Sequence, residues 1–153
     1  MSSSTQSWTV LVYSEDAKVR ERIRTAVGRR PAGDIGRVEY AEAATAAEVV
    51  ALVDAGSVDL CILDGEAWPA GGLGICRQLK HEIARCPLML VVVGRQADRW
   101  LAAWSQCDAV LVHPLDAVDA ATTVAGLLRG AAQQRADHQP AQHQPADHQP
   151  AER

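Results

Sequence analysis

The sequence predicts an α/β protein in which helices cover both faces of a parallel sheet. Short apolar, β-rich runs alternate with amphipathic helical segments five times over about 120 residues, the pattern of a βα-repeating fold. The 153-residue chain is 48% hydrophobic but only 4% aromatic, with no Phe, so Val, Leu, Ile and Ala must form its core. Such a composition suits strands that are buried on both faces. The length allows one domain with a single core.

Individual elements follow from apolar periodicity and from helix-terminus signals. The expected strands are residues 8–13, 38–43, 58–64, 88–93 and 109–112, with a helix after each. Candidate N-caps are Asp16, Asp98 and Asp116, and Thr45 with Glu48 matches a capping box. The third helix is expected over about 75–84, after a glycine-rich loop interpreted as a flexible turn. The last helix is expected to bury Val118, Thr122, Ala125 and Leu128 and to end at Gly130.

Charge and cysteine content argue against several classes of protein. The formal net charge is −4 and basic residues do not cluster, so no nucleic-acid partner is expected. Residues 1–7 are polar and no apolar run approaches the length of a membrane span, so neither a signal peptide nor a membrane partner is expected. The four cysteines are scattered without metal-site spacing. We therefore expect reduced thiols in a cytoplasmic protein.

Both ends of the chain are predicted to be disordered. Residues 1–7 form a polar leader, and residues 131–153 contain three near-identical pentapeptides of the type Ala-Asp-His-Gln-Pro. These repeats carry no apolar side chain larger than Ala and cannot bury a core. Their histidines suggest metal binding, but a flexible chain would lose entropy on closing around an ion. An extended His/Gln/Pro tail is the preferred interpretation.

Asp64 is the leading candidate for a functional residue. It ends the apolar run 58–64 and is followed by Gly65. Other expected strands end in Ser14-Glu15 and His113. Because the carboxyl ends of parallel strands meet at one rim, these side chains are expected to share a crevice.

At these positions the chain resembles a response-regulator receiver domain. The resemblance is carried by Val10-Leu11-Val12 followed by Ser14-Glu15-Asp16, by the strand 58–64, by Pro87 to Gly94, and by His113-Pro114-Leu115-Asp116, where receivers have Lys-Pro-Phe-Asp. It covers residues 8–130 and implies a doubly wound, flavodoxin-like (βα)5 fold with strand order 2-1-3-4-5. It also implies a cis His113–Pro114 bond. The composition and the segment 100–105 are similar to those of small stand-alone actinobacterial receivers.

The resemblance implies that Asp64 accepts a phosphoryl group from a histidine kinase. In receivers, two acidic residues hold a divalent metal, a Thr or Ser and a Lys bind phosphoryl oxygens, and an aromatic side chain reports occupancy. Here the corresponding positions hold Ser14 with Glu15, Val93, His113 and Val110. The loop after Asp64 is slightly longer than usual and places Trp68 before Pro69, so Trp68 is expected beside Asp64. The phosphoryl-accepting Asp is retained, while most of the residues that assist phosphorylation in receivers are replaced.

The residues leave two interpretations of the crevice open. Glu15 and Asp64 can together hold Mg²⁺ weakly, because two carboxylates, a loop carbonyl and water suffice for weak binding. Alternatively, a protonated His113 pairs with Asp64 as the lysine of receivers does, with neither metal nor phosphate.

We therefore predict an atypical stand-alone receiver, not an enzyme, that acts in two-component signalling through protein–protein contacts. Because only the repeat tail follows residue 130, no DNA-binding output domain is expected. The alternatives are a working phosphoacceptor, with Mg²⁺ on Glu15 and Asp64, and a binder of a small ligand or nucleotide. Trp100 and Trp104 lie one helical turn apart and are candidates for a partner or homodimer face; core packing is the other interpretation.

Overall fold

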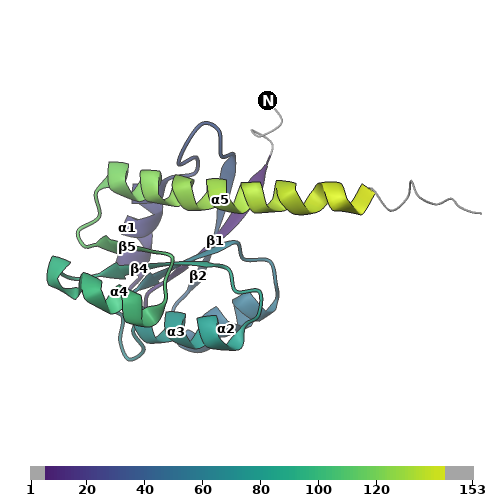
Figure 1. Ribbon diagram of the computed structural model, residues 1–153. Helices are drawn as coiled ribbons and strands as arrows, with labels where there is room; N and C mark the ends of the chain where they lie inside the picture. Colours follow the sequence, from purple (N-terminus) through teal and green to yellow (C-terminus); the bar gives the residue numbers. More distant parts are fainter. Residues whose placement is uncertain (1–5, 144–153) are drawn as a thin grey trace, which may run out of the picture.

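A five-stranded parallel sheet lies between two layers of helices in the computed structural model, which describes residues 6–143 (Figure 1). The elements are β1 (Ser7–Tyr13), α1 (Ala17–Val27), β2 (Arg37–Ala43), α2 (Ala46–Asp54), β3 (Leu60–Asp64), α3 (Gly72–Glu82), β4 (Leu88–Val93), the 3-10 turn η2 (Gln96–Arg99), α4 (Trp100–Ser105), β5 (Ala109–Val112) and α5 (Ala117–His143). The strand order is β2-β1-β3-β4-β5. The predicted fold class and strand order are confirmed.

Alternation along the strands divides the core into two halves. Trp8, Val10 and Val12 of β1 pack with α1 and α5 on one face of the sheet. Leu11 and Tyr13 pack with α2 and α3 on the other face, where α4 also lies (Figure 1). Even-numbered residues of β1 and β3 therefore face α1 and α5, and the polar residues that end these rows point to the same side.

Most of the expected N-cap residues form the capping hydrogen bonds that the sequence indicates. The Asp16 side chain accepts the backbone N–H of Lys18. Thr45 and Glu48 form both hydrogen bonds of a capping box. The expected cap at Asp98 is wrong: this residue lies inside η2, where its carboxylate pairs with Arg95 at 3.0 Å.

The C-terminal helix α5 continues past Gly130, where it was expected to end, as far as His143. A single glycine weakens a helix by only about 1 kcal/mol. Ala131 and Ala132 pack against the core, and Arg135 pairs with Asp59 at 2.6 Å while lying over the Trp8 ring. Residues 131–143 thus belong to α5 instead of to the predicted tail, whose remaining part, 144–153, lies outside the described residues.

The N-terminal boundary and the buried face of α5 also differ from expectation. Ser7, placed in the predicted leader, already belongs to β1, and residues 1–5 lie outside the described part of the chain. In α5 the buried residues are Ala120, Val124, Ala125 and Leu128. Val118 is 71% exposed, because it lies about half a turn around the helix from Ala120.

The end of the glycine-rich segment, Gly72 to Gly74, is the first turn of α3, where a flexible turn was expected. Gly71 is the N-cap of α3, and Gly72 is its first residue. Gly72 lies against the end of β3 so closely that an added Cβ would be 2.8 Å from the Asp64 carbonyl oxygen and from the Leu63 Cβ. This close approach fixes the start of α3 beside Asp64.

The lengths and compositions of the helices also bear on a membrane location. Between residues 6 and 143, no helix is both long enough and apolar enough to span a bilayer.

Candidate functional site

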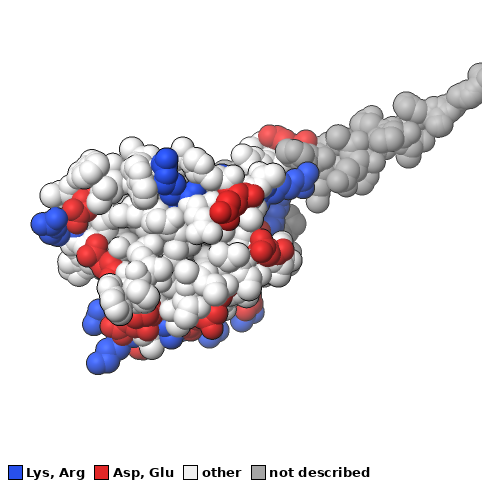
Figure 2. Space-filling model, turned by 90° about the horizontal axis from the view of Figure 1, so that it is seen from below, with Lys and Arg blue, Asp and Glu red and all other residues white. Residues whose placement is uncertain are grey.

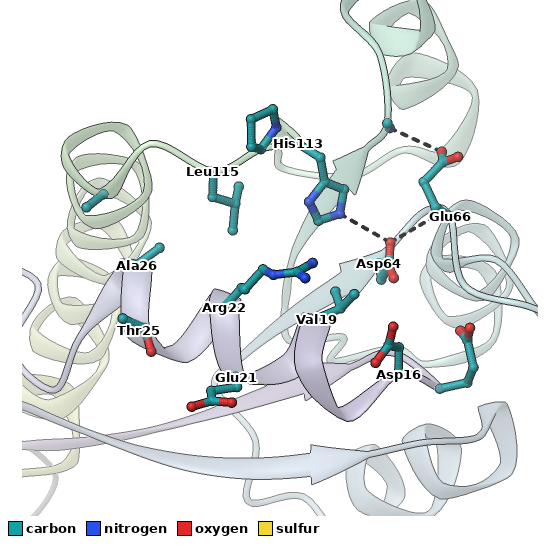
Figure 3. A pocket seen from close by; sticks show the side chains of 14 residues that line it. Asp16, Val19, Glu21, Arg22, Thr25, Ala26, Asp64, Glu66, His113 and Leu115 are labelled. Atoms are coloured by element: carbon teal, nitrogen blue, oxygen red, sulfur yellow. Dashed lines mark hydrogen bonds and ion pairs between the residues drawn. The ribbon is translucent and has the colours of Figure 1, made fainter.

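A cavity of about 940 Å³ lies at the carboxyl ends of the strands, between α1 and the segment that joins β5 to α5 (Figure 3). Asp64 and His113 line it from the sheet. Val19, Ala26 and Leu115 contribute apolar surface from the two sides. The sequence prediction of a shared crevice at this rim is therefore correct for Glu15, Asp64 and His113, which line the cavity, and for Ser14, which bonds Asp64.

The Asp64 carboxylate is buried, with 4% of the residue exposed, and it accepts hydrogen bonds at both oxygens. The Ser14 hydroxyl donates to Oδ2 at 2.9 Å, and the backbone N–H of Glu66 donates to Oδ1 at 2.9 Å. The Nε2 atom of His113 lies 3.4 Å from Oδ1 (Figure 3). These groups come from the ends of β1, β3 and β5, so strand pairing alone brings them together.

The hydrogen bonds keep Asp64 ionised despite its burial. Burial raises the pKa of this carboxyl, but the hydrogen bonds from His113, Glu66 and Ser14, together with positive charge on His113, outweigh burial. The net result is a pKa below the ordinary value of 3.8. Asp64 is therefore an anion at neutral pH.

The lowered pKa predicts a pH-dependent contribution of Asp64 to stability. Because the folded-state pKa lies below the unfolded value, this contribution is present above about pH 4 and is lost as the pH falls through the folded-state pKa. The difference in the free energy of unfolding between the wild type and Asp64→Asn should therefore shrink on acidification. Urea unfolding at a series of pH values measures it, and a difference independent of pH would contradict the assignment.

Ser14 and Glu15 replace the acidic pair of receivers in different ways. The Ser14 hydroxyl lies against Asp64 and also accepts the Asp16 N–H at 3.1 Å. Glu15 is exposed, and its Oε1 accepts the backbone N–H of Trp68 at 3.0 Å. The structure therefore brings Ser14, but not the Glu15 carboxylate, into contact with Asp64.

Receiver domains generally bind Mg²⁺ beside the acceptor, and the donor set of this crevice does not fit that ion. Both Asp64 oxygens already accept protein hydrogens, and the Glu15 carboxylate is bonded to a loop amide. Over the described part of the chain, no three His, Cys, Asp or Glu side chains form a group able to hold a metal. The predicted Glu15–Asp64 pairing for Mg²⁺ is not formed in this arrangement.

Two positions at which the family places its readout residues lie away from the crevice. Val93 is fully buried, and Val110 packs beside it, in the core on the α2–α3 side of the sheet. Val93 does not face Asp64, because odd-numbered residues of β4 point to the opposite face of the sheet, whereas Val92, which pairs with Asp64, lies on the Asp64 side. The His113–Pro114 bond is cis, as the resemblance implied, and so is the Trp68–Pro69 bond.

Two residues of the crevice were missed at the level of sequence. Glu66 follows Asp64 by two residues, and its Oε2 accepts the Gly94 N–H at 3.1 Å. Arg22 of α1 points its guanidinium into the cavity (Figure 3). An acid close after Asp64 was a visible signal, but its reach to Gly94 depends on the pairing of β3 with β4.

The loop between β3 and α3 is fixed by contacts along its length. Gly65 donates to the Val92 carbonyl at 2.7 Å, and the Tyr13 hydroxyl donates to the Ala70 carbonyl. Trp68 was expected beside Asp64, but its backbone N–H bonds the Glu15 carboxylate and its side chain is 75% exposed. The ring therefore projects from the rim into solvent.

Trp100 and Trp104 are on the surface of α4, with exposed fractions of 70% and 47%. The core-packing interpretation of this pair is wrong. The Arg77 guanidinium lies 4.8 Å from the centre of the Trp104 ring and donates to the Trp104 carbonyl at 2.6 Å. Figure 2 shows the side of the molecule formed by α2, α3 and α4, where a broad uncharged area is bordered by interspersed acidic and basic residues.

Solved structures with the same fold are receiver domains. The REC domain of AraT, a response regulator from Geobacillus stearothermophilus, superposes with a TM-score of 0.68 at 24% identity, covering 84% of this chain and 98% of that chain. A CheY-like receiver domain protein from Methanospirillum hungatei gives a TM-score of 0.65 at 16% identity, covering 84% and 99%. The fold is thus that of a response-regulator receiver.

Sequence comparison gives the family. No protein-family model matches the chain. An uncharacterized response regulatory protein of Mycobacterium tuberculosis is 46% identical over 132 residues, covering 86% of this chain and 99% of the relative. The chain belongs to the response regulatory proteins, as a receiver of two-component signalling.

Proposed function

We propose that this receiver acts in the cytoplasm through protein–protein contacts that do not depend on phosphorylation of Asp64. The observation that carries the proposal is the set of hydrogen bonds at the acceptor. The Ser14 hydroxyl donates to Oδ2 of Asp64, the Glu66 amide donates to Oδ1, and His113 also lies beside Oδ1. A carboxylate must use one of these oxygens to attack a phosphoryl group, so each contact opposes the reaction.

The position of Val93 supports the same proposal. It has no hydroxyl group, and its side chain is enclosed in the core on the face of the sheet opposite to Asp64. Val92, which pairs with Asp64 on the other face of the sheet from Val93, has no hydroxyl group either, so a group bound at Asp64 finds no side-chain donor at the end of β4. This arrangement is consistent with signalling that does not depend on whether a group is bound at Asp64.

The exposed tryptophans supply a surface for such contacts. Large aromatic side chains bury much area at little entropic cost and are favoured in interface centres. Trp100 and Trp104 lie one helical turn apart on α4 and are both exposed. We propose that this surface binds a histidine kinase, another signalling protein or a second copy of the chain.

The alternative function is a phosphoacceptor that a histidine kinase phosphorylates on Asp64. The ionised state of Asp64 and the open cavity beside it favour this alternative. With Mg²⁺ held by both Glu15 and Asp64, it requires the Glu15 carboxylate to leave the Trp68 amide and turn toward Asp64.

Tryptophan fluorescence separates the two functions. In a Trp100→Phe, Trp104→Phe background, emission comes from Trp68 at the rim and from buried Trp8. We expect Mg²⁺ followed by beryllofluoride to give no saturable change, in the presence or absence of Asp64→Asn. A saturable change that Asp64→Asn abolishes would establish the phosphoacceptor and overturn the proposal.

A further inference from the structure

We infer that Glu66 blocks the crevice against anions. Its carboxylate accepts the backbone N–H of Gly94 at the end of β4 and so keeps a phosphoryl-type anion from binding to that N–H. The inference rests on the proposed function and extends it, because it names the group that closes the site.

The contacts of Glu66 join the ends of two neighbouring strands. Its side-chain Oε2 accepts the Gly94 N–H at 3.1 Å, directly after β4. Its own N–H donates to Asp64 Oδ1 at 2.9 Å, at the end of β3 (Figure 3). A backbone N–H at such a strand end is a natural donor to an oxyanion. Here that donor is already bonded to a carboxylate of the same chain.

The residue at position 94 makes room for this carboxylate. A Cβ added to Gly94 would lie 2.8 Å from Cδ and 3.0 Å from Oε1 of Glu66. Any larger residue at position 94 would therefore displace the Glu66 side chain. Glycine at position 94 and glutamate at position 66 form a matched pair.

The charges around the cavity strengthen the exclusion. Acidic side chains face it from three segments, with Glu15 and Asp16 after β1, Glu21 on α1, and Asp64 and Glu66 at the end of β3. The opposing groups are His113 and Arg22, and Arg22 makes no ion pair with any residue between 6 and 143. Removing the Glu66 carboxylate would free the Gly94 N–H and lessen the negative charge that an added anion meets.

Beryllofluoride with Mg²⁺ is the probe, and the Gly94 amide resonance in a ¹H–¹⁵N spectrum is the reporter. We expect Glu66→Ala to bind the probe saturably, at least about tenfold more tightly than the limit below which the wild type shows no binding, with movement of the Gly94 resonance, because one donor is released. Glu21→Ala is the matched control: it removes an equal charge from the cavity and leaves the Glu66–Gly94 bond intact. Like the wild type, it should show no saturable binding.

Gly94→Ala tests the same contact by a second route. It should raise the affinity of the wild-type chain for the probe, because the new methyl group displaces the Glu66 carboxylate, and it should add nothing to Glu66→Ala. No binding by Glu66→Ala, binding by the wild type that is as tight as that of Glu66→Ala, or equally tight binding by Glu21→Ala would overturn the inference. The proposed function fails on a different result, namely saturable binding by the wild type that depends on Asp64.

Discussion

Gly72→Ala is expected to lower the free energy of unfolding by about 3 kcal/mol. The added methyl group would lie 2.8 Å from backbone and Cβ atoms of β3, and neither neighbour can turn away as a flexible side chain could. Relief requires α3 to move off the sheet, and overpacking of this kind typically costs about 1–3 kcal/mol before the loss of neighbouring core contacts. Urea unfolding followed by far-ultraviolet circular dichroism measures the change.

Gly74→Ala supplies the control within the same helix. An added Cβ at Gly74 meets no atom within 4 Å. Alanine has the higher helix propensity, so this variant should gain about 0.5–1 kcal/mol. Two glycines two residues apart are therefore expected to respond with opposite signs. A loss of stability in both variants would contradict the assignment of close approach to β3 at Gly72 and of helix propensity alone at Gly74.

Replacing Trp100 and Trp104 together by Ala is expected to weaken association through α4 by at least about 100-fold. Each ring at the centre of an interface contributes about 2 kcal/mol or more. Because the two rings are 70% and 47% exposed in the single chain, the free energy of unfolding should fall by less than about 1 kcal/mol. Sedimentation velocity over a concentration series measures self-association directly.

Trp68→Ala is the matched control for this surface. Trp68 is more exposed than either of them, at 75%, but lies on the loop between β3 and α3. It should leave the sedimentation profile unchanged. A wild-type chain that stays monomeric at every concentration would refute the homodimer. A large loss of stability in the Trp100 and Trp104 double variant, without any change in association, would indicate that both residues stabilise the fold instead of an interface.

Local chemistry made much of the fold predictable. The apolar runs that became β1, β3 and β4 have no competing pattern, and Asp16 and Thr45 bond to backbone groups within three residues. The boundaries that failed depend on distant contacts. The sequence around Gly130 indicates a helix end, but Arg135 reaches Asp59 and Trp8 on other elements and continues the helix.

The candidate site shows the same division between local and distant effects. Asp64 and His113 were placed together because both end parallel strands, which topology alone decides. The directions of Glu15 and Glu66 could not be foreseen, because each carboxylate bonds a backbone amide on another segment, at Trp68 and Gly94. Those bonds depend on how segments far apart in the sequence meet at the rim of the sheet.

The direction of α5 determines how the protein should be attached to a sensor surface. The helix starts at Ala117, which lines the cavity, and its 27 residues extend about 40 Å toward the opposite end of the sheet (Figure 1). Arg135 meets Trp8 and Asp59 near that opposite end, where β1 and β3 begin. An anchor coupled to the last turns of α5 would therefore orient the crevice away from the support and toward the flowing analyte.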